Sequence, residues 1–231
     1  MSLPTAAIRL DQSMKQPLDS FVTNLSYFTR VFGNTDYGEL NWIGHLGGPP
    51  GGLPRNTYHN VGKALDISWL HWEGGNVSRP YHAAAEVKDT NGWKHTTHRR
   101  LVAVEAGLRK WFGYVLNRGI SNHDNHFHVD NGCPAALRLK SSSSSRTHTS
   151  CHFFMQDCIY AFTDEKIEYN GNWDDSSKRA CKTLLSDLGM ECLNPAKYVS
   201  HYMLFLDYIM MHGFADAPAG TYRWGDSALV L

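Results

Sequence analysis

Two short histidine-rich motifs, far apart in the chain, limit what this sequence can fold into more than any other feature. The two motifs are His59-Asn-Val-Gly62-Lys-Ala-Leu-Asp66 and His123-Asp-Asn-His126-Phe-His128-Val-Asp130. Together they supply a carboxylate and several imidazoles, the ligand set that zinc takes when it keeps one coordination position open for water. If the fold brings both motifs to one point, they predict a metal-dependent enzyme.

Composition excludes several classes of protein. The chain has 231 residues with 42% hydrophobic side chains, which is ordinary for a globular protein. Lys+Arg and Asp+Glu are equal at 22 each, so we expect no basic surface and no nucleic-acid partner. No apolar run approaches the roughly 18 residues of a transmembrane helix. The first residues also lack the apolar core of a secretory signal.

Five cysteines are present, and four of them follow residue 150. They are Cys133, Cys151, Cys158, Cys181 and Cys192. None has CxxC spacing, so the pattern favours a disulfide in the C-terminal region, as in extracytoplasmic proteins, with one thiol left over.

A polar stretch between Leu137 and Cys151, with serine at every position from 141 to 145, predicts a flexible linker. We therefore expect two domains of ordinary size. The predicted boundaries are a catalytic domain at 1–136, the linker at 137–150 and a helical domain at 151–231.

Periodicity predicts an α+β catalytic domain, with a small mixed sheet flanked by helices. Strands are expected at 26–32, at 64–68 and around 127–129, and a helix at 96–112. In the second strand, Leu65 and Ile67 should enter the core while Asp66 points the other way. In the third, alternation places His126, His128 and Asp130 on one surface.

Helical spacing of apolar residues predicts that the C-terminal domain is all-α. The expected helices cover 153–162, 176–188 and 198–211, and the residues from Asp174 supply an N-cap for the second. The third is apolar nearly throughout and should be buried.

The first motif suits a junction between a loop and a strand. Gly62 allows the backbone to turn, so that His59 and Asp66 can meet at one metal. On a strand, His126 and His128 lie roughly 6 to 7 Å apart, so one can bind the metal while the other acts on its water.

Zinc makes its water acidic and polarises a carbonyl, which suits peptide hydrolysis. A second histidine can then carry the proton from the water to the leaving amine. His123 could share this proton transfer or orient the substrate, and Asp130 could fix the tautomer of an imidazole ligand.

Other residues have both a functional and a structural interpretation. Trp69, with His71 and Trp72, could line a substrate groove or pack a loop. Arg55 and Arg30 could bind a substrate carboxylate through a guanidinium or remain solvated at the surface. His95 and His98 have HxxH spacing without a third ligand, so we expect them at the surface.

The paired motifs resemble the signature of the zinc D-Ala-D-Ala carboxypeptidase and hedgehog-type peptidases, and the second motif resembles the extensin-like branch. The resemblance covers roughly residues 20 to 135. It implies that the zinc ligands are His59, Asp66 and His128 and that His126 and His123 are catalytic. It also implies that the substrate is peptidoglycan, cut next to a D-amino acid by an endopeptidase or a D,D-carboxypeptidase.

The chain departs from the family pattern at two places. Tyr58 stands where a serine is common, and the region of Asn125 and His123 lacks the acidic residue that dipeptidase branches place there. Substrate positioning and the identity of the general base are therefore open.

The C-terminal region resembles a degenerate three-helix peptidoglycan-binding module. The resemblance rests on Gln156 in one helix and on the stretch from Asn170 to Ala180, which contains Gly171 and Trp173. Asn170, Asp174 and Asp175 depart from the module's pattern. A buried turn around Gly171 and Trp173 is the structural alternative.

These observations predict an extracytoplasmic zinc peptidase that acts on peptidoglycan. Without a visible signal it would reach the periplasm or the cell exterior as a delivered toxin or a lysin, and a toxin would need an immunity protein. The alternative from another class is a non-catalytic zinc module that binds cell wall or protein.

Overall fold

A long amphipathic helix, α1 (Gln12–Phe32), begins the part of the chain that the computed structural model describes. Asp11 caps this helix by accepting a hydrogen bond from the Ser13 amide. The described residues are 10–33, 37, 40–45, 58–59, 62–73, 77–78, 96–132, 136–139, 145–217 and 219–221.

The strand that we predicted at 26–32 is wrong, because these residues form the end of α1. Phe21, Leu25 and Phe28 are buried at helical spacing. The weak alternation of a seven-residue window is part of this longer helical stripe.

The sheet is antiparallel in every pairing among the described residues, so the predicted mixed sheet is wrong while the α+β class is confirmed. Its strand order is β1-β2-β5-β4, and the short β3 also pairs with β2. The strands are β1 (Leu40–His45), β2 (Ala64–Trp72), β3 (Val77–Ser78), β4 (Tyr114–Leu116) and β5 (Phe127–Asp130).

An irregularity in β2 decides which side chains share a face. The register passes from the pair His45–Ile67 to the pair Gly44–Trp69, so Ser68 is an extra residue and a β-bulge. The bulge shifts the alternation by one residue. Leu65 and Ile67 therefore face the core together with Leu70 and Trp72, as their burial shows.

The opposite side of the sheet, the outer face, carries the polar and aromatic side chains. Cross-strand partners share a face, and the registers assign to it Trp42 and Gly44 of β1, Asp66, Trp69 and His71 of β2, His128 and Asp130 of β5, and Tyr114 and Leu116 of β4. The predicted directions of Leu65, Ile67 and Asp66 agree with this assignment.

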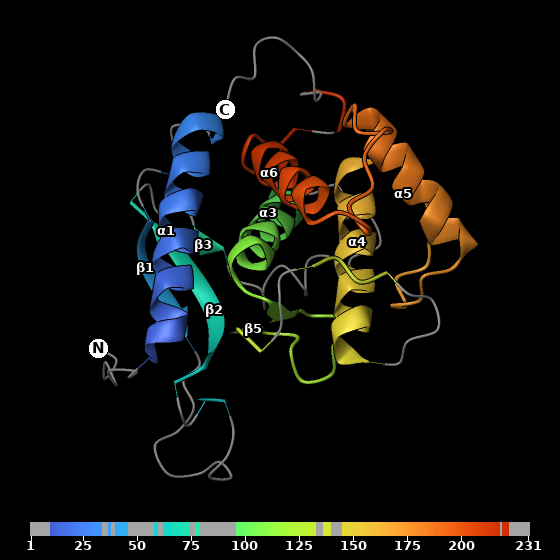
Figure 1. Cartoon of the computed structure of the whole chain (residues 1–231). Coiled ribbons are helices and arrows are strands. Elements are labelled where there is room, and N and C mark those ends of the chain that lie inside the picture. Colours follow the sequence, from blue (N-terminus) through green and yellow to red (C-terminus); the bar gives the residue numbers. More distant parts are fainter. Residues whose placement is uncertain are drawn as a thin grey trace.

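Four more helices complete the described fold: α3 (Thr96–Trp111), α4 (Arg146–Phe162), α5 (Asp175–Asp187) and α6 (Val199–Phe214). Their predicted existence is confirmed, as is the Asp174 N-cap of α5. Figure 1 shows α3 and α6 crossing near the centre, with α4 and α5 beside them. No helix among the described residues is long and apolar enough to cross a membrane.

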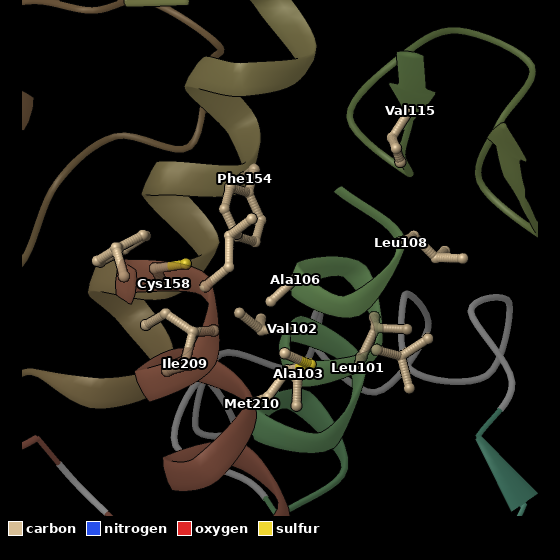
Figure 2. Close-up of a cluster of buried hydrophobic side chains, with 14 of the residues drawn as sticks. Leu101, Val102, Ala103, Ala106, Leu108, Val115, Phe154, Cys158, Ile209 and Met210 are labelled. Carbon is tan, nitrogen blue, oxygen red and sulfur yellow. The ribbon is translucent and has the colours of Figure 1, made fainter. Parts of the chain in front are cut away.

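The C-terminal helices do not form a visibly separate domain, because they share one hydrophobic core with the first half of the chain. Figure 2 shows side chains of α3, α4 and α6 meeting in this core. At Gly213 of α6 a Cβ would lie 2.5 Å from the Ala103 Cβ and 2.5 Å from the Arg99 carbonyl oxygen, so the two helix backbones are in close contact.

The predicted linker is in part structured. Leu137 is buried in the core, and Arg146 to Ser150 form the first turns of α4, which begins at a Ser145 N-cap. The expected disulfide is also wrong for the four described cysteines, since Cys151, Cys158, Cys181 and Cys192 are all free thiols.

His98 is not a surface residue. It is fully buried, and its Nε2 lies 3.1 Å from Asp157 Oδ1 on α4. The aspartate also pairs with Arg118 and accepts a hydrogen bond from the Tyr169 hydroxyl. His98 therefore makes a buried polar contact between α3 and α4, while His95 lies outside the described residues.

Candidate metal centre

Strand pairing brings the two histidine motifs together. In the β2–β5 ladder, Asp66 lies directly opposite His128 on the outer face. His59 precedes β2 by one turn, which is closed by hydrogen bonds from the Gly62 amide to the His59 carbonyl and from the Lys63 amide to the Tyr58 carbonyl. Gly62 has a φ of 72°, so the expectation that this glycine permits the turn is confirmed.

His59, Asp66 and His128 form a possible metal-binding triad whose ligand atoms all lie within 4.8 Å of one another. His128 Nδ1 is 2.9 Å from Asp66 Oδ1 and 3.0 Å from His59 Nε2. His59 Nε2 is 3.4 Å from Asp66 Oδ1. A tetrahedral ion with bonds of about 2.1 Å separates its ligands by about 3.4 Å. The His59–Asp66 distance has this value, and the two distances from His128 are somewhat shorter.

Asp130 lies on the far side of the His128 ring. Its Oδ2 is 3.3 Å from His128 Nε2, and its Oδ1 accepts a hydrogen bond of 2.6 Å from the Gly132 amide. A proton on Nε2 that is donated to Asp130 leaves the Nδ1 lone pair directed at the triad. A carboxylate that accepts a hydrogen bond from an imidazole ligand in this way fixes the tautomer and orientation of the ring.

His126 and His123 both lie beside the triad. His126 Nε2 is 3.6 Å from Asp66 Oδ1, and its Nδ1 is 2.7 Å from the side-chain oxygen of Asn125. The His123 ring lies 4.9 Å from that of His126, and its Nδ1 is 2.9 Å from the Ser121 carbonyl oxygen. In both rings a proton on Nδ1 leaves Nε2 as the acceptor.

Burial and charge set the protonation states of the metal-free cluster. Burial lowers the pKa of His59, His126 and His123, and the carboxylate of Asp66 only partly opposes this effect. Burial also opposes the charged form of His128, but hydrogen bonds to Asp130 and Asp66 outweigh it and raise the pKa to about 9. Without a metal, His128 is therefore the protonated imidazole of this cluster at neutral pH.

For Asp66, burial favours the neutral acid. The hydrogen bond from His128 and the nearby imidazoles outweigh burial and lower the pKa of the carboxyl. Asp66 is thus an ionised ligand at neutral pH, as metal coordination requires.

A cavity of about 570 Å³ adjoins the triad on the β4 side. Its lining includes His59, His128 and His123, together with Arg138 and Arg146. Sequence reasoning missed both arginines, because they lie in the stretch that we assigned to the linker. Arg146 begins α4, but the polar sequence of residues 146 to 150 gave no signal of a helix.

Three aromatic rings lie on the other side of Asp66, and we call them the aromatic shelf: Trp42, Trp69 and His71. The Trp42 ring is stacked on His71 at 5.3 Å and lies 6.3 Å from Trp69. Trp42 is 45% exposed, whereas Trp72 is buried in the core. The bulge at Ser68 places Trp69 on the outer face and Trp72 in the core.

The structure does not bring Arg30 to the triad. Arg30 is exposed in the last turn of α1, while the other end of this helix contacts the motifs through a hydrogen bond from the Asp11 amide to the Gly62 carbonyl. The helical rise of 1.5 Å per residue places Arg30 about 28 Å from Asp11. Arg55 lies outside the described residues.

Gly171 and Trp173 form the buried turn that was the alternative to a binding motif. Gln156 is fully buried, accepts a hydrogen bond from the Gly171 amide and donates one to the Asn172 carbonyl. Gly171 has a φ of 69°, and Trp173 is buried beside His152. These contacts pack Gly171 and Trp173 against α4.

No protein-family model matches this chain, and neither a curated protein nor a solved structure is significantly similar to it.

Proposed function

We propose that this protein is a zinc-dependent peptidase. The observation that carries the proposal is the convergence of two imidazoles and a carboxylate on one point, with His126 next to them but outside the triad. Three protein ligands with a neighbouring base suit a catalytic zinc site, whereas structural zinc sites usually have four ligands.

Zinc, when bound, would supply an acidified water and a Lewis acid for the scissile carbonyl. His126 is the proposed base. Because burial lowers its pKa, its Nε2 is unprotonated at neutral pH and can take the proton of the attacking water. The resulting imidazolium, stabilised by Asp66, can then deliver this proton to the leaving amine. His123 is placed to share the proton or to hold the substrate.

The proposed substrate is the D-amino-acid-containing peptide of bacterial peptidoglycan, which rests on the resemblance of the two motifs to the D-Ala-D-Ala carboxypeptidase and hedgehog-type family. Both an endopeptidase and a D,D-carboxypeptidase agree with the site. Purified sacculi should be digested with and without a chelator, and the muropeptides analysed by mass spectrometry. A new peptide terminus that appears only without chelator supports the proposal, and unchanged muropeptides contradict it.

A non-catalytic zinc module is the alternative, and His126 separates the two. We expect His126→Ala to retain zinc and to lose about 100-fold to 10,000-fold in hydrolysis rate, the usual contribution of a general base. His45→Ala, an exposed histidine of the same sheet, is the matched control. If wild type binds zinc stoichiometrically without cutting any peptide, the binding module is the better assignment.

We further propose an extracytoplasmic site of action, as a delivered toxin or a lysin. Export to the periplasm of a bacterial host should then be toxic, while expression in the cytoplasm should not, and an immunity protein should protect the periplasm. The same proposal gives the C-terminal helices a role in holding the enzyme on peptidoglycan, which raises the local substrate concentration. Equal toxicity in both compartments would contradict this placement.

A further inference from the structure

The connection between β4 and β5, residues 117–126, carries His123 in its middle and ends at His126. We call this connection the histidine loop. Each of its first three residues, 117–119, contacts α3 or α4 through buried groups. None of the groups that anchor the loop has a role in the proposed hydrolysis, so their effect on the site is a separate question.

Asn117 makes the first anchor. Its side chain is fully buried, and its Nδ2 donates a hydrogen bond of 2.8 Å to Glu105 Oε1 on α3. Glu105 is itself buried and is fixed by Arg109, whose guanidinium lies 2.7 Å from the same carboxylate oxygen. Arg109 also donates hydrogen bonds of 2.9 and 2.7 Å to the carbonyl and the hydroxyl of Ser150 on α4. Asn117 is therefore bonded to a buried network that joins both helices.

Arg118 and Gly119 add two anchors on the side of α4. The Arg118 guanidinium pairs with the buried Asp157 and lies 4.5 Å from the centre of the Tyr169 ring. At Gly119 a Cβ would lie 2.2 Å from the Phe153 ring, so the absence of a side chain lets the backbone pass this close to α4. Three consecutive anchored residues leave the start of the histidine loop little freedom to move.

Backbone hydrogen bonds extend this anchoring to His123. The Ile120 amide donates a hydrogen bond of 2.9 Å to the Asn117 carbonyl, and the His123 amide donates one of 3.0 Å to the Ile120 carbonyl. The Ile120 side chain, between these two bonds, is buried. The two turns place the His123 ring 4.9 Å from the His126 ring and 5.9 Å from the His128 ring. The position of His123 beside the metal centre thus depends on a network that begins at Asn117.

We propose that Asn117 is a positioning residue, which holds His123 beside the metal centre by coupling the histidine loop to the Glu105–Arg109 pair. A hydrogen bond from a buried amide to a carboxylate is stronger than one between neutral groups, so its loss should release the root of the loop. The part that His123 takes in hydrolysis rests on the proposed function. Under this proposal α3 and α4 set the geometry of the site, which is a different role from holding the protein on peptidoglycan.

The distance between two histidine rings in the metal-free protein tests the proposal without catalysis. NMR of the wild type with labelled histidines should show a nuclear Overhauser cross-peak between His123 and His126, whose ring centres lie 4.9 Å apart. A displacement of about 1 Å, enough to impair catalysis, would weaken this cross-peak about 3-fold, because its intensity falls with the sixth power of the distance. We expect Asn117→Ala to weaken it at least this much while circular dichroism shows a folded protein.

Gln156→Ala is the matched control. Gln156 is an equally buried amide on α4, and it accepts a hydrogen bond of 3.0 Å from the Gly171 amide, in a turn outside the histidine loop. A general loss of stability should appear in both variants, whereas only Asn117→Ala should weaken the cross-peak. If Asn117→Ala does not fold, Asn117→Ser decides the test. Its hydroxyl can still accept the hydrogen bond from the Gly119 amide but is too short to reach Glu105.

Two results would overturn the positioning role: wild type lacks the cross-peak between His123 and His126, or a folded Asn117 variant keeps it at full strength. Hydrolysis by the zinc-loaded protein is scored separately. If wild type cuts peptide, Asn117→Ala should lose about 10-fold to 100-fold in kcat, and adding His123→Ala should cost nothing further. A weakened cross-peak in Asn117→Ala, with no hydrolysis by wild type, leaves the positioning role standing and removes the peptidase. An unchanged cross-peak, with hydrolysis by wild type, removes the positioning role and leaves the peptidase.

Discussion

Asp66 and His128 face each other across the β2–β5 pair, with Oδ1 of the aspartate 2.9 Å from Nδ1 of the histidine. Two of the three proposed ligands are thus positioned by backbone hydrogen bonding, and the third by a turn that contains Gly62. The triad lies on the outer face of the sheet, with the cavity of about 570 Å³ on the β4 side and the aromatic shelf on β1 and β2.

Asp130→Asn should weaken zinc binding by about 10-fold to 100-fold, the usual effect of losing a carboxylate that hydrogen-bonds a metal-binding imidazole. The amide cannot hold the His128 ring with the same charge, although the fold should persist. Zinc affinity is to be measured by competition with a chelating dye. Asp124→Asn is the matched control, because Asp124 is an exposed carboxylate of the same motif. Equal affinities in the two variants would remove Asp130 from the site.

The metal-free protein should lose stability as the solution becomes alkaline. The pKa of His128 is raised from 6.5 to about 9 in the folded state. The stabilisation is therefore complete below about pH 6.5 and disappears as pH rises through 9. The shift corresponds to about 3 kcal/mol in the free energy of unfolding.

Urea unfolding of the chelated protein at pH 6 and pH 9 measures this effect. His128→Gln should remove that part of the pH dependence, because the variant lacks the titrating ring. If wild type and variant change in parallel between the two pH values, His128 does not hold the proton.

The short motifs predicted the site better than periodicity predicted the fold. His59 and Asp66 could be placed because a glycine permits a turn before the strand, whereas the choice of His128 over His126 came from the resemblance to the peptidase family. The segment 26–32 failed because a few alternating residues also fit the stripe of a longer helix. Its helical identity depends on Phe21 and Leu25, which lie outside that window.

Tertiary contacts account for the other errors. His98 and Asp157 are 59 positions apart, and they come into contact only because α3 packs on α4. No local sequence pattern predicts this contact. Arg146 was hidden in a serine-rich stretch whose last part is helical. The bulge at Ser68 places Trp69 on the same face as Asp66 and Trp72 in the core. The composition of this segment does not predict the bulge.

Trp42→Ala should weaken binding to purified sacculi by about 2-fold to 10-fold, the energy of one aromatic contact. The ring is exposed and stacked on His71, on the same face as Asp66, so its removal should leave zinc content unchanged. Tyr198→Ala is the matched control, since Tyr198 is an aromatic side chain of similar exposure that also contacts a histidine, at the start of α6. Equal sacculus binding by wild type and Trp42→Ala would exclude the aromatic shelf from the substrate path.

Gly213→Ala should destabilise the whole described fold and not only its C-terminal helices. The added Cβ would lie 2.5 Å from both the Ala103 Cβ and the Arg99 carbonyl oxygen, so α6 must move away from α3. Overpacking of this kind costs about 1 to 3 kcal/mol, which exceeds the gain of about 1 kcal/mol in helix propensity.

Thermal unfolding followed by circular dichroism and by tryptophan fluorescence measures the effect. Because both halves of the chain share one core, we expect a single transition that shifts down by several degrees with both probes. Ser200→Ala, at an exposed position of the same helix, should leave the midpoint unchanged. Two separate transitions, of which only one shifts in Gly213→Ala, would contradict this expectation. The C-terminal helices would then fold as a separate domain, and the metal centre would not depend on them.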